Sequence, residues 1–182
     1  MTALAQQSPT ALLATLAEGS LDGAWTLDPS KSSVSLKTKS MWGLAKINAV
    51  FTDLQGEIAV VAGAVTARVV VGTGSIDTKN AKRDKHLRSD DLLATDTFPH
   101  LIFVLDSVAP SPTAIQANGT LTVRDQTRPI VFETTVSAAG DSEITVTSEL
   151  DVDRGDYDVT WNQLGMARMN NSVSIKAVFT RA

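Results

Sequence analysis

Alternation of apolar and polar residues with a period of two recurs through the chain beyond Trp25, and it constrains the fold more than any other feature. Side chains two residues apart point to the same face of a β-strand, so this pattern predicts strands and not helices. It occurs in about eight segments of the usual strand length. These segments are 34–39, 46–52, 65–71, 101–105, 115–123, 130–136, 144–150 and 173–179.

The connections between these segments predict how the strands pair. Parallel neighbours require a crossover of a dozen or more residues, usually a helix, and no series of long helical crossovers separates the segments. Successive strands should therefore pair antiparallel, with an up-and-down barrel as the simplest closure. The 182 residues contain no repeat and no Pro-rich linker, so we expect a single all-β barrel domain.

Two short helices and one irregular segment should interrupt this pattern. Ser8-Pro9 is typical of a helix start, and Gly19 can end that helix. A short amphipathic helix is thus predicted within an N-terminal extension, residues 1–23, ahead of a barrel domain at 24–182. Its apolar face carries Leu12, Leu13 and Leu16. The helix either braces the barrel as a lid or contacts an oligomer partner or a membrane surface.

The other two interruptions lie within the predicted barrel domain. Residues 79–89 (KNAKRDKHLRS) are rich in helix formers and predict a helical insertion outside the sheet. Residues 155–171 mix Asn, Gly and Asp with scattered Trp and Met, which predicts a long loop.

Composition excludes several classes of function. A formal net charge of −4 gives no chain-wide basic surface for nucleic acid. Without cysteine there is no disulfide, thiolate nucleophile or iron–sulfur site. The N-terminus has neither a basic start nor a continuous apolar stretch, so we expect a cytoplasmic chain without stable membrane insertion.

Candidate catalytic and metal-binding residues are few. Asp84, His86 and Ser89 lie close together in the sequence, but no nucleophile-elbow motif accompanies them. His86 and His100 are fourteen positions apart, without a spacing typical of metal ligands. We therefore expect no catalytic residue, no metal and no cofactor.

Two further motifs have simpler structural interpretations. The acidic residues between Asp151 and Asp158 lack the terminal glutamate of a calcium loop, and Arg154 among them can pin a solvated loop. The glycine-rich run at 72–75 has neither the lysine of a phosphate-binding loop nor a following crossover, so a turn at the end of a strand is sufficient.

A series of short blocks carries a family resemblance over roughly residues 25–180. The most distinctive is Arg83-Asp-Lys-His-Leu-Arg-Ser89, preceded by Ser75-Ile-Asp-Thr78. Other blocks are Trp25 to Val34, Phe51 to Gly56, Phe98-Pro99 with Phe103, Gly119 to Val123, Thr127-Arg-Pro129 and Asp153-Arg154. In their order these blocks resemble the YceI-like family of polyisoprenoid-binding, lipocalin-like proteins.

The resemblance implies an elongated antiparallel barrel that holds a polyprenyl chain, an isoprenoid quinone or a fatty-acid derivative, with no catalytic residues. The sequence differs from the family pattern at Lys31, where histidine is frequent, at 38–40, and at Leu92-Leu93, which replace an aromatic pair. These differences affect the head group of a ligand more than its class.

The strand alternation selects the residues that should line an internal cavity. An eight-stranded barrel is either just filled by side chains or holds one small ligand. The candidate lining residues are Val34, Leu36, Ala49, Phe51, Ala67, Val69, Phe103, Ala117, Phe132 and Ala177. We expect a carrier of a long-chain isoprenoid or other lipid, with a homodimer left open. The alternatives are a structural dimerisation module with a filled barrel and, less favoured, a small hydrolase or isomerase that uses His86.

Overall fold

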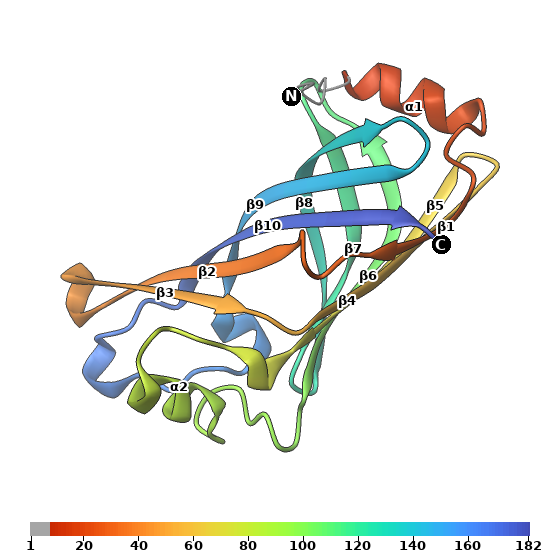
Figure 1. The fold of residues 1–182 in the computed structure, drawn as a ribbon. Coiled ribbons are helices and arrows are strands. Elements are labelled where there is room, and N and C mark those ends of the chain that lie inside the picture. The colour runs from red at the N-terminus through yellow and green to blue at the C-terminus, as the bar shows by residue number, and fades with distance from the viewer. Residues whose placement is uncertain (1–7) are drawn as a thin grey trace.

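The structure is a computed structural model that describes residues 8–182, and its main feature is one strongly curved sheet of ten antiparallel strands (Figure 1). The helices are α1 (Pro9–Ala17) and α2 (Ala81–Arg88). The strands are β1 (Gly23–Leu27), β2 (Ser33–Ser40), β3 (Ala45–Phe51), β4 (Leu54–Val61), β5 (Ala64–Gly72), β6 (His100–Pro110), β7 (Ile115–Val123), β8 (Gln126–Ala139), β9 (Glu143–Asp153) and β10 (Asn170–Arg181).

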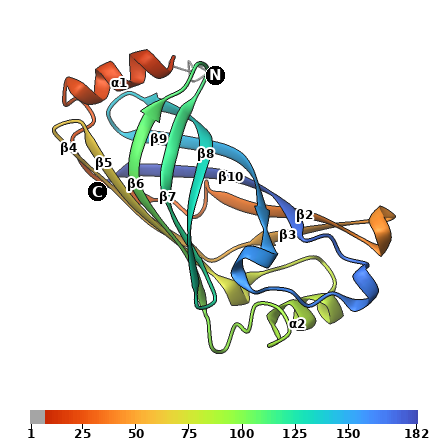
Figure 2. The ribbon, with the colours of Figure 1, turned by 180° about the vertical axis from the view of Figure 1, so that it is seen from behind.

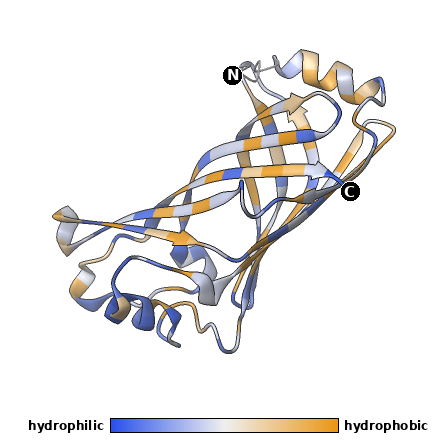
Figure 3. Ribbon diagram, in the orientation of Figure 1, coloured by the Kyte–Doolittle hydropathy of each residue, from blue (hydrophilic) through white to orange (hydrophobic). Residues whose placement is uncertain are grey.

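Eight of the ten strands close into a ring. The order is β1-β4-β5-β6-β7-β8-β9-β10, and β10 pairs with β1 to complete it. Every neighbouring pair is antiparallel, which confirms the predicted lipocalin-like barrel of about eight strands. Hydrophobic and hydrophilic residues alternate along the strands of the wall (Figure 3), as expected for strands with one face inside and one face in solvent.

The remaining two strands form a hairpin that extends the wall beyond the ring. The first part of β10 pairs with β2, and β2 pairs with β3, so the β2–β3 hairpin continues the sheet at the end of the barrel near α2 (Figures 1 and 2). The eight ring strands are thus not the eight segments that the alternation predicts. That pattern includes β2 and β3, and it misses β1 and β4.

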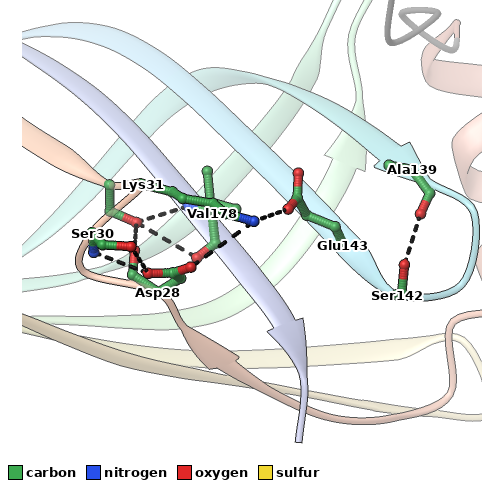
Figure 4. Close-up of polar contacts among 8 residues, drawn as sticks. Asp28, Ser30, Lys31, Ala139, Ser142, Glu143 and Val178 are labelled. Atoms are coloured by element: carbon green, nitrogen blue, oxygen red, sulfur yellow. Dashed lines mark hydrogen bonds and ion pairs between the residues drawn. The ribbon is translucent and has the colours of Figure 1, made fainter. Parts of the chain in front are cut away.

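The barrel closes where β10 changes its partner from β2 to β1. At this seam the backbone N–H of Val178 donates to Ser32 Oγ at 2.9 Å, and the carbonyl oxygen of Val178 accepts from the backbone N–H of Asp28 at 2.8 Å. Lys31 reaches across to Glu143 of β9, with 2.7 Å between Nζ and Oε2 (Figure 4). The β1–β2 turn therefore supplies the hydrogen bonds that the sheet ladder lacks at this point.

Helix α1 lies across the end of the barrel opposite α2 (Figures 1 and 2). Its predicted start is confirmed: Ser8 Oγ accepts from the backbone N–H of Ala11 at 3.2 Å, and Pro9 begins the helix. Leu12 and Leu16 are buried. The helix is therefore packed on the barrel as a lid. Residues 1–7 of the predicted N-terminal extension lie outside the described part of the chain.

The helical insertion predicted at 79–89 is present as α2, outside the sheet. Its first turn is capped by Asn80 Oδ1, which accepts from the backbone N–H of Arg83 at 3.0 Å. Arg88 ties the helix to the preceding turn by donating to the carbonyl oxygens of Gly74 and Ile76, at 2.9 and 2.6 Å.

The segment between β9 and β10 is irregular, as predicted, with two short 3₁₀ turns, η3 (Arg154–Tyr157) and η4 (Gln163–Gly165). We call residues 154–169 the β9–β10 loop. Between residues 8 and 182, no helix has the length and apolar character needed to cross a membrane.

Candidate functional site

The barrel encloses a cavity of about 620 Å³. All ten strands contribute apolar side chains to its wall, together with leucines of α1 at one end and residues of α2 and the β9–β10 loop at the other. The cavity therefore extends along the barrel from α1 to α2. A wall of this kind offers dispersion contacts and few hydrogen-bonding groups.

All ten residues selected from the sequence lie on the wall of this cavity: Val34, Leu36, Ala49, Phe51, Ala67, Val69, Phe103, Ala117, Phe132 and Ala177. They come from seven strands, and the rings of Phe103 and Phe132 pack against each other with 5.4 Å between their centroids. Contact between these residues and a ligand remains a prediction.

Side chains do not fill the interior of the barrel. Several inward-facing residues, among them Val34, Leu36 and Val69, keep accessible surface although they point away from bulk solvent. In a filled barrel these side chains would be buried against one another. The open space argues against the filled barrel that a purely structural module would have.

The α1 end of the cavity is closed. Leu12, Leu16 and Leu21 line it and are only 4, 8 and 3 % exposed. Trp25 braces this end: its Nε1 donates to the carbonyl oxygen of Leu21 at 3.0 Å, and the Arg181 guanidinium lies 4.5 Å from its ring centroid. The sequence pattern identified the helix but did not place its leucines in the cavity wall.

The α2 end of the cavity is bordered by polar and partly exposed side chains, and we call this end the mouth. Arg83 and His86 reach it from α2, and Trp161 and Arg168 from the β9–β10 loop. The His86 and Trp161 rings meet edge to face with 4.3 Å between centroids, which links helix and loop. The sequence singled out His86 as a catalytic or metal-binding candidate and Arg83 as part of a family block, but it placed neither residue at an opening of the cavity.

Arg154 fixes the shape of the β9–β10 loop. Its Nη1 donates to the carbonyl oxygens of Val159 and Trp161 at 2.7 and 2.8 Å, and its Nε to that of Arg168 at 3.3 Å. This geometry agrees with the pinning role expected for Arg154. Burial lowers the pKa of the guanidinium, and the Asp153 carboxylate opposes that shift.

Three buried side-chain polar atoms have no hydrogen-bond partner in the described part of the chain: Thr38 Oγ1, Arg124 Nε and Arg154 Nη2. Of these residues, Thr38 and Arg154 line the cavity. Such atoms are costly to leave unpaired, so those of Thr38 and Arg154 are candidate contacts for a polar group of a ligand. Nearby, Tyr157 is 3 % exposed, and burial together with the Asp156 carboxylate raises the pKa of its hydroxyl.

The residues considered for nucleophilic catalysis do not form a triad. Asp84 accepts from the backbone N–H and the hydroxyl of Thr78, at 2.9 and 2.6 Å. The Ser89 hydroxyl donates to the carbonyl oxygen of His86 at 2.7 Å, and His86 Nε2 lies 3.4 Å from Asp91. Asp84 and Ser89 therefore have structural partners, and neither is directed at the imidazole.

The motifs considered for metal and phosphate binding also have structural roles. Asp153 caps the η3 turn by accepting from the backbone N–H of Gly155 at 2.8 Å, and Asp151 accepts from Ser172 Oγ at 2.7 Å. Ser75 Oγ donates to the carbonyl oxygen of Gly72 at 2.7 Å. Over residues 8–182, no three His, Asp or Glu side chains gather as a metal site.

The ordered blocks of the sequence and the closed barrel point to one family. The family model for the YceI-like domain matches residues 25–180. The chain belongs to the YceI-like family. Its match to individual members is more limited: YceI-like relatives named Protein YceI, from Shigella flexneri and from Escherichia coli O157:H7, are each 38 % identical over 73 residues. These alignments span 40 % of this chain and 38 % of each relative.

Solved YceI-like and related structures share the fold at low sequence identity. BcnA of Burkholderia cenocepacia superposes with a TM-score of 0.76 at 19 % identity, over 84 % of this chain and 98 % of that one. A polyisoprenoid-binding domain from Saccharophagus degradans superposes with a TM-score of 0.73 at 16 % identity, over 87 and 98 %. These superpositions show that the fold is shared.

Proposed function

We propose that this protein binds a long-chain apolar molecule inside its barrel, as a carrier or as a store. The ligand class is a polyisoprenoid, an isoprenoid quinone or a fatty-acid derivative. The cavity carries the proposal, because its volume of about 620 Å³ and its apolar wall suit a hydrocarbon chain. The S. degradans neighbour, described as a polyisoprenoid-binding domain, supports the same class.

Burial of the ligand's hydrocarbon tail in the cavity supplies enough free energy for micromolar affinity. Each buried methylene is worth about 0.8 kcal/mol, so a tail of ten would contribute roughly 8 kcal/mol before association and ordering costs. Micromolar binding corresponds to about 8 kcal/mol, and a longer tail offsets those costs. No polar contact is needed along the tail.

The polar end of the ligand belongs at the mouth in this arrangement. Arg83, His86 and Trp161 border that end, and Thr38 Oγ1 lies there unpaired among the described residues. The α1 end offers apolar side chains, among them Leu12, Leu16 and Leu21. A ligand therefore enters tail first and keeps its head group near α2 and the β9–β10 loop.

We further propose that the protein is not an enzyme. Asp84 and Ser89 are used in structural hydrogen bonds, and His86 lies against Trp161 at the rim. A carrier requires only the cavity, whereas an acid–base enzyme would require a group positioned to transfer a proton.

Native mass spectrometry after incubation with a long-chain polyprenol tests the proposal. We expect one lipid per chain, and Ala67→Trp or Ala117→Trp should lower occupancy more than stability, because both positions face the cavity. Thr66→Trp is the matched control, since Thr66 is the exposed neighbour of Ala67 on β5.

Absence of bound lipid in the native protein, or equal occupancy in the native and both Ala→Trp proteins, would contradict the proposed cavity binding. Conversion of a bound lipid by the native chain, lost in His86→Ala at unchanged occupancy, would instead establish an enzyme.

A further inference from the structure

Large apolar side chains are exposed together beside the mouth of the cavity. Met41, Trp42 and Leu44, at the tip of the β2–β3 hairpin, are 52, 70 and 86 % exposed, and Leu164 of η4 is 80 % exposed. We call these four residues the tip patch. Together with Trp161 they are five of the eight large hydrophobic residues exposed over residues 8–182.

The two parts of the tip patch are joined by backbone hydrogen bonds. The N–H of Trp42 donates to the carbonyl oxygen of Met166 at 3.2 Å, and the N–H of Arg168 donates to that of Lys39 at 3.0 Å. The hairpin tip and the β9–β10 loop are therefore held side by side at the α2 end (Figure 1). Trp161 and Arg168 of the same loop border the mouth.

Three residues of the tip patch have a backbone conformation that is energetically unfavourable for residues other than glycine. Met41, Trp42 and Leu164 have φ angles of 51°, 54° and 52°, in the left-handed region that favours glycine. Large apolar residues at such positions, exposed to water, gain nothing for the fold. Their identity is better explained by a partner than by packing.

Exposed lysines surround the tip patch without acidic partners. Lys37 and Lys39 on β2 and Lys46 on β3 are exposed, and Lys39 lies directly opposite Lys46 in the ladder. Like charges facing each other across strands are destabilising. The ion pairs found within residues 8–182 use none of these lysines. This basic region is notable in a chain with a net charge of −4.

We propose that the tip patch and its lysines dock the protein onto a bilayer that contains anionic lipids, with the mouth of the cavity at the membrane surface. Tryptophan favours the membrane–water interface, and lysines on flexible stems reach anionic head groups while apolar neighbours enter the acyl boundary. A symmetric contact with a second copy fits less well, because it would bring lysines against lysines.

This docking surface deepens the proposed carrier function and rests on it for its purpose, because a long lipid tail crosses water poorly on its way to the cavity. Docking does not depend on cargo, however, and is measured without it. Loading of a polyprenol from solution, followed by native mass spectrometry, tests the carrier function separately in the same variants.

The experiment is vesicle flotation with phosphatidylcholine alone and with phosphatidylcholine plus phosphatidylglycerol. We expect the native protein to prefer the anionic vesicles and to bind them less as salt is raised. Trp42→Ser combined with Leu44→Ser should weaken binding at least about tenfold through lost apolar burial. Lys39→Glu combined with Lys46→Glu should abolish the preference for phosphatidylglycerol, since each lysine near an anionic surface contributes about fivefold.

Matched controls separate the tip patch from general surface effects. Val61→Ser and Val131→Ser change exposed apolar residues elsewhere and should bind like the native protein. Lys176→Glu is the control for the lysine variants and should keep the preference for phosphatidylglycerol. Lys176 is an exposed lysine at the end of the β2–β10 ladder away from the tip patch, opposite Ser33. Quenching of tryptophan emission by brominated acyl chains should be reduced in Trp42→Leu, which keeps an apolar side chain at the tip and leaves Trp161 in place.

Three results would overturn the inference. The first is a native protein that binds neither kind of vesicle. The second is unchanged binding in both double variants while they remain folded. The third is a native dimer by light scattering that the tip variants convert to monomers without any vesicle binding, which would make the tip patch an interface between copies.

Discussion

Ser32 connects the β1–β2 turn to β10 through one hydroxyl. Its Oγ accepts from the backbone N–H of Val178 at 2.9 Å and donates to the carbonyl oxygen of Asp28 at 2.7 Å. Val178 is 2 % exposed, so its N–H has no water to replace a lost acceptor. Ser32→Ala should lower the free energy of unfolding by about 1–3 kcal/mol, measured by urea denaturation.

Ser30→Ala is the control for this prediction. Ser30 lies in the same turn and donates to Asp28 Oδ1 at 2.6 Å, but this contact is exposed. It should cost well under about 1 kcal/mol. Equal losses in the two variants would mean that the hydroxyl of Ser32 is not specifically needed at the seam.

Asp84 and Arg83 are neighbours on α2 with different roles. Asp84 is buried and accepts two hydrogen bonds from Thr78, whereas the Arg83 side chain borders the cavity. Asp84→Ala should cost about 1–3 kcal/mol, because it leaves a buried N–H unpaired, and Arg83→Ala about 0.5 kcal/mol or less. Asp84→Asn keeps the acceptor oxygen and should cost less than Asp84→Ala. Thermal unfolding distinguishes the variants, and a larger loss for Arg83→Ala would refute the assignment.

At the scale of elements, α1 acts as the closed end of the cavity. Leu16→Ala removes part of that closure and should lower the free energy of unfolding by about 2 kcal/mol, near the lower limit for buried leucine. A fluorescent fatty acid bound inside should then be released faster. Ala14→Ser, on the exposed face of the same helix, should change neither quantity. Unchanged release in Leu16→Ala would show that contacts of the ligand with this closed end do not slow its release.

The strands also mark how far the sequence predicts the fold. The alternation of apolar and polar residues predicted the barrel class and the inward-facing residues, because successive side chains of a strand point to opposite faces of the sheet. It missed β4, although Leu54, Ile58 and Val60 alternate there, because Gly56 reads as a turn residue. In the structure Gly56 lies within the strand, and a Cβ there would lie 3.2 Å from the Leu27 side chain. Here the glycine makes room for a neighbouring strand.

The mouth could not be predicted in the same way. Its side chains come from α2 and the β9–β10 loop, whose placement depends on contacts between distant segments, such as that of His86 with Trp161. No periodicity encodes such contacts. The alternation therefore located the cavity wall, and only the structure located its opening.

The whole molecule should be most stable over a broad range of pH. The hydrogen bond from the Ser30 side chain, with Lys31 nearby, lowers the pKa of Asp28 below 3.8, so its contribution is present above that value and is lost as pH falls through the lower, folded-state pKa. Glu143 raises the pKa of Lys31 above 10.5, so that contribution is present below this value and is lost as pH rises through the folded-state pKa. Urea midpoints should thus be level between about pH 4 and pH 10 as far as these groups contribute.

Variants separate the two limits of this range. In a plot of urea midpoint against pH, Asp28→Asn should reduce the loss of stability at acid pH, and Glu143→Gln should reduce the loss at alkaline pH. Each effect should be small, because both contacts are exposed and screened by solvent. An alkaline limb that is as steep in Glu143→Gln as in the native protein would assign the dependence to other groups.

Because α1 closes one end of the cavity, the length of the cavity limits how long a ligand tail can be buried. Leu12, Leu16 and Leu21 form the closed end, so a hydrocarbon tail that enters from the mouth can extend only until it meets them. Across a series of ligands that differ only in tail length, each added carbon should strengthen binding by a similar step until the tail reaches the closed end. Beyond that length the surplus carbons must fold back or remain in water, and the gain stops.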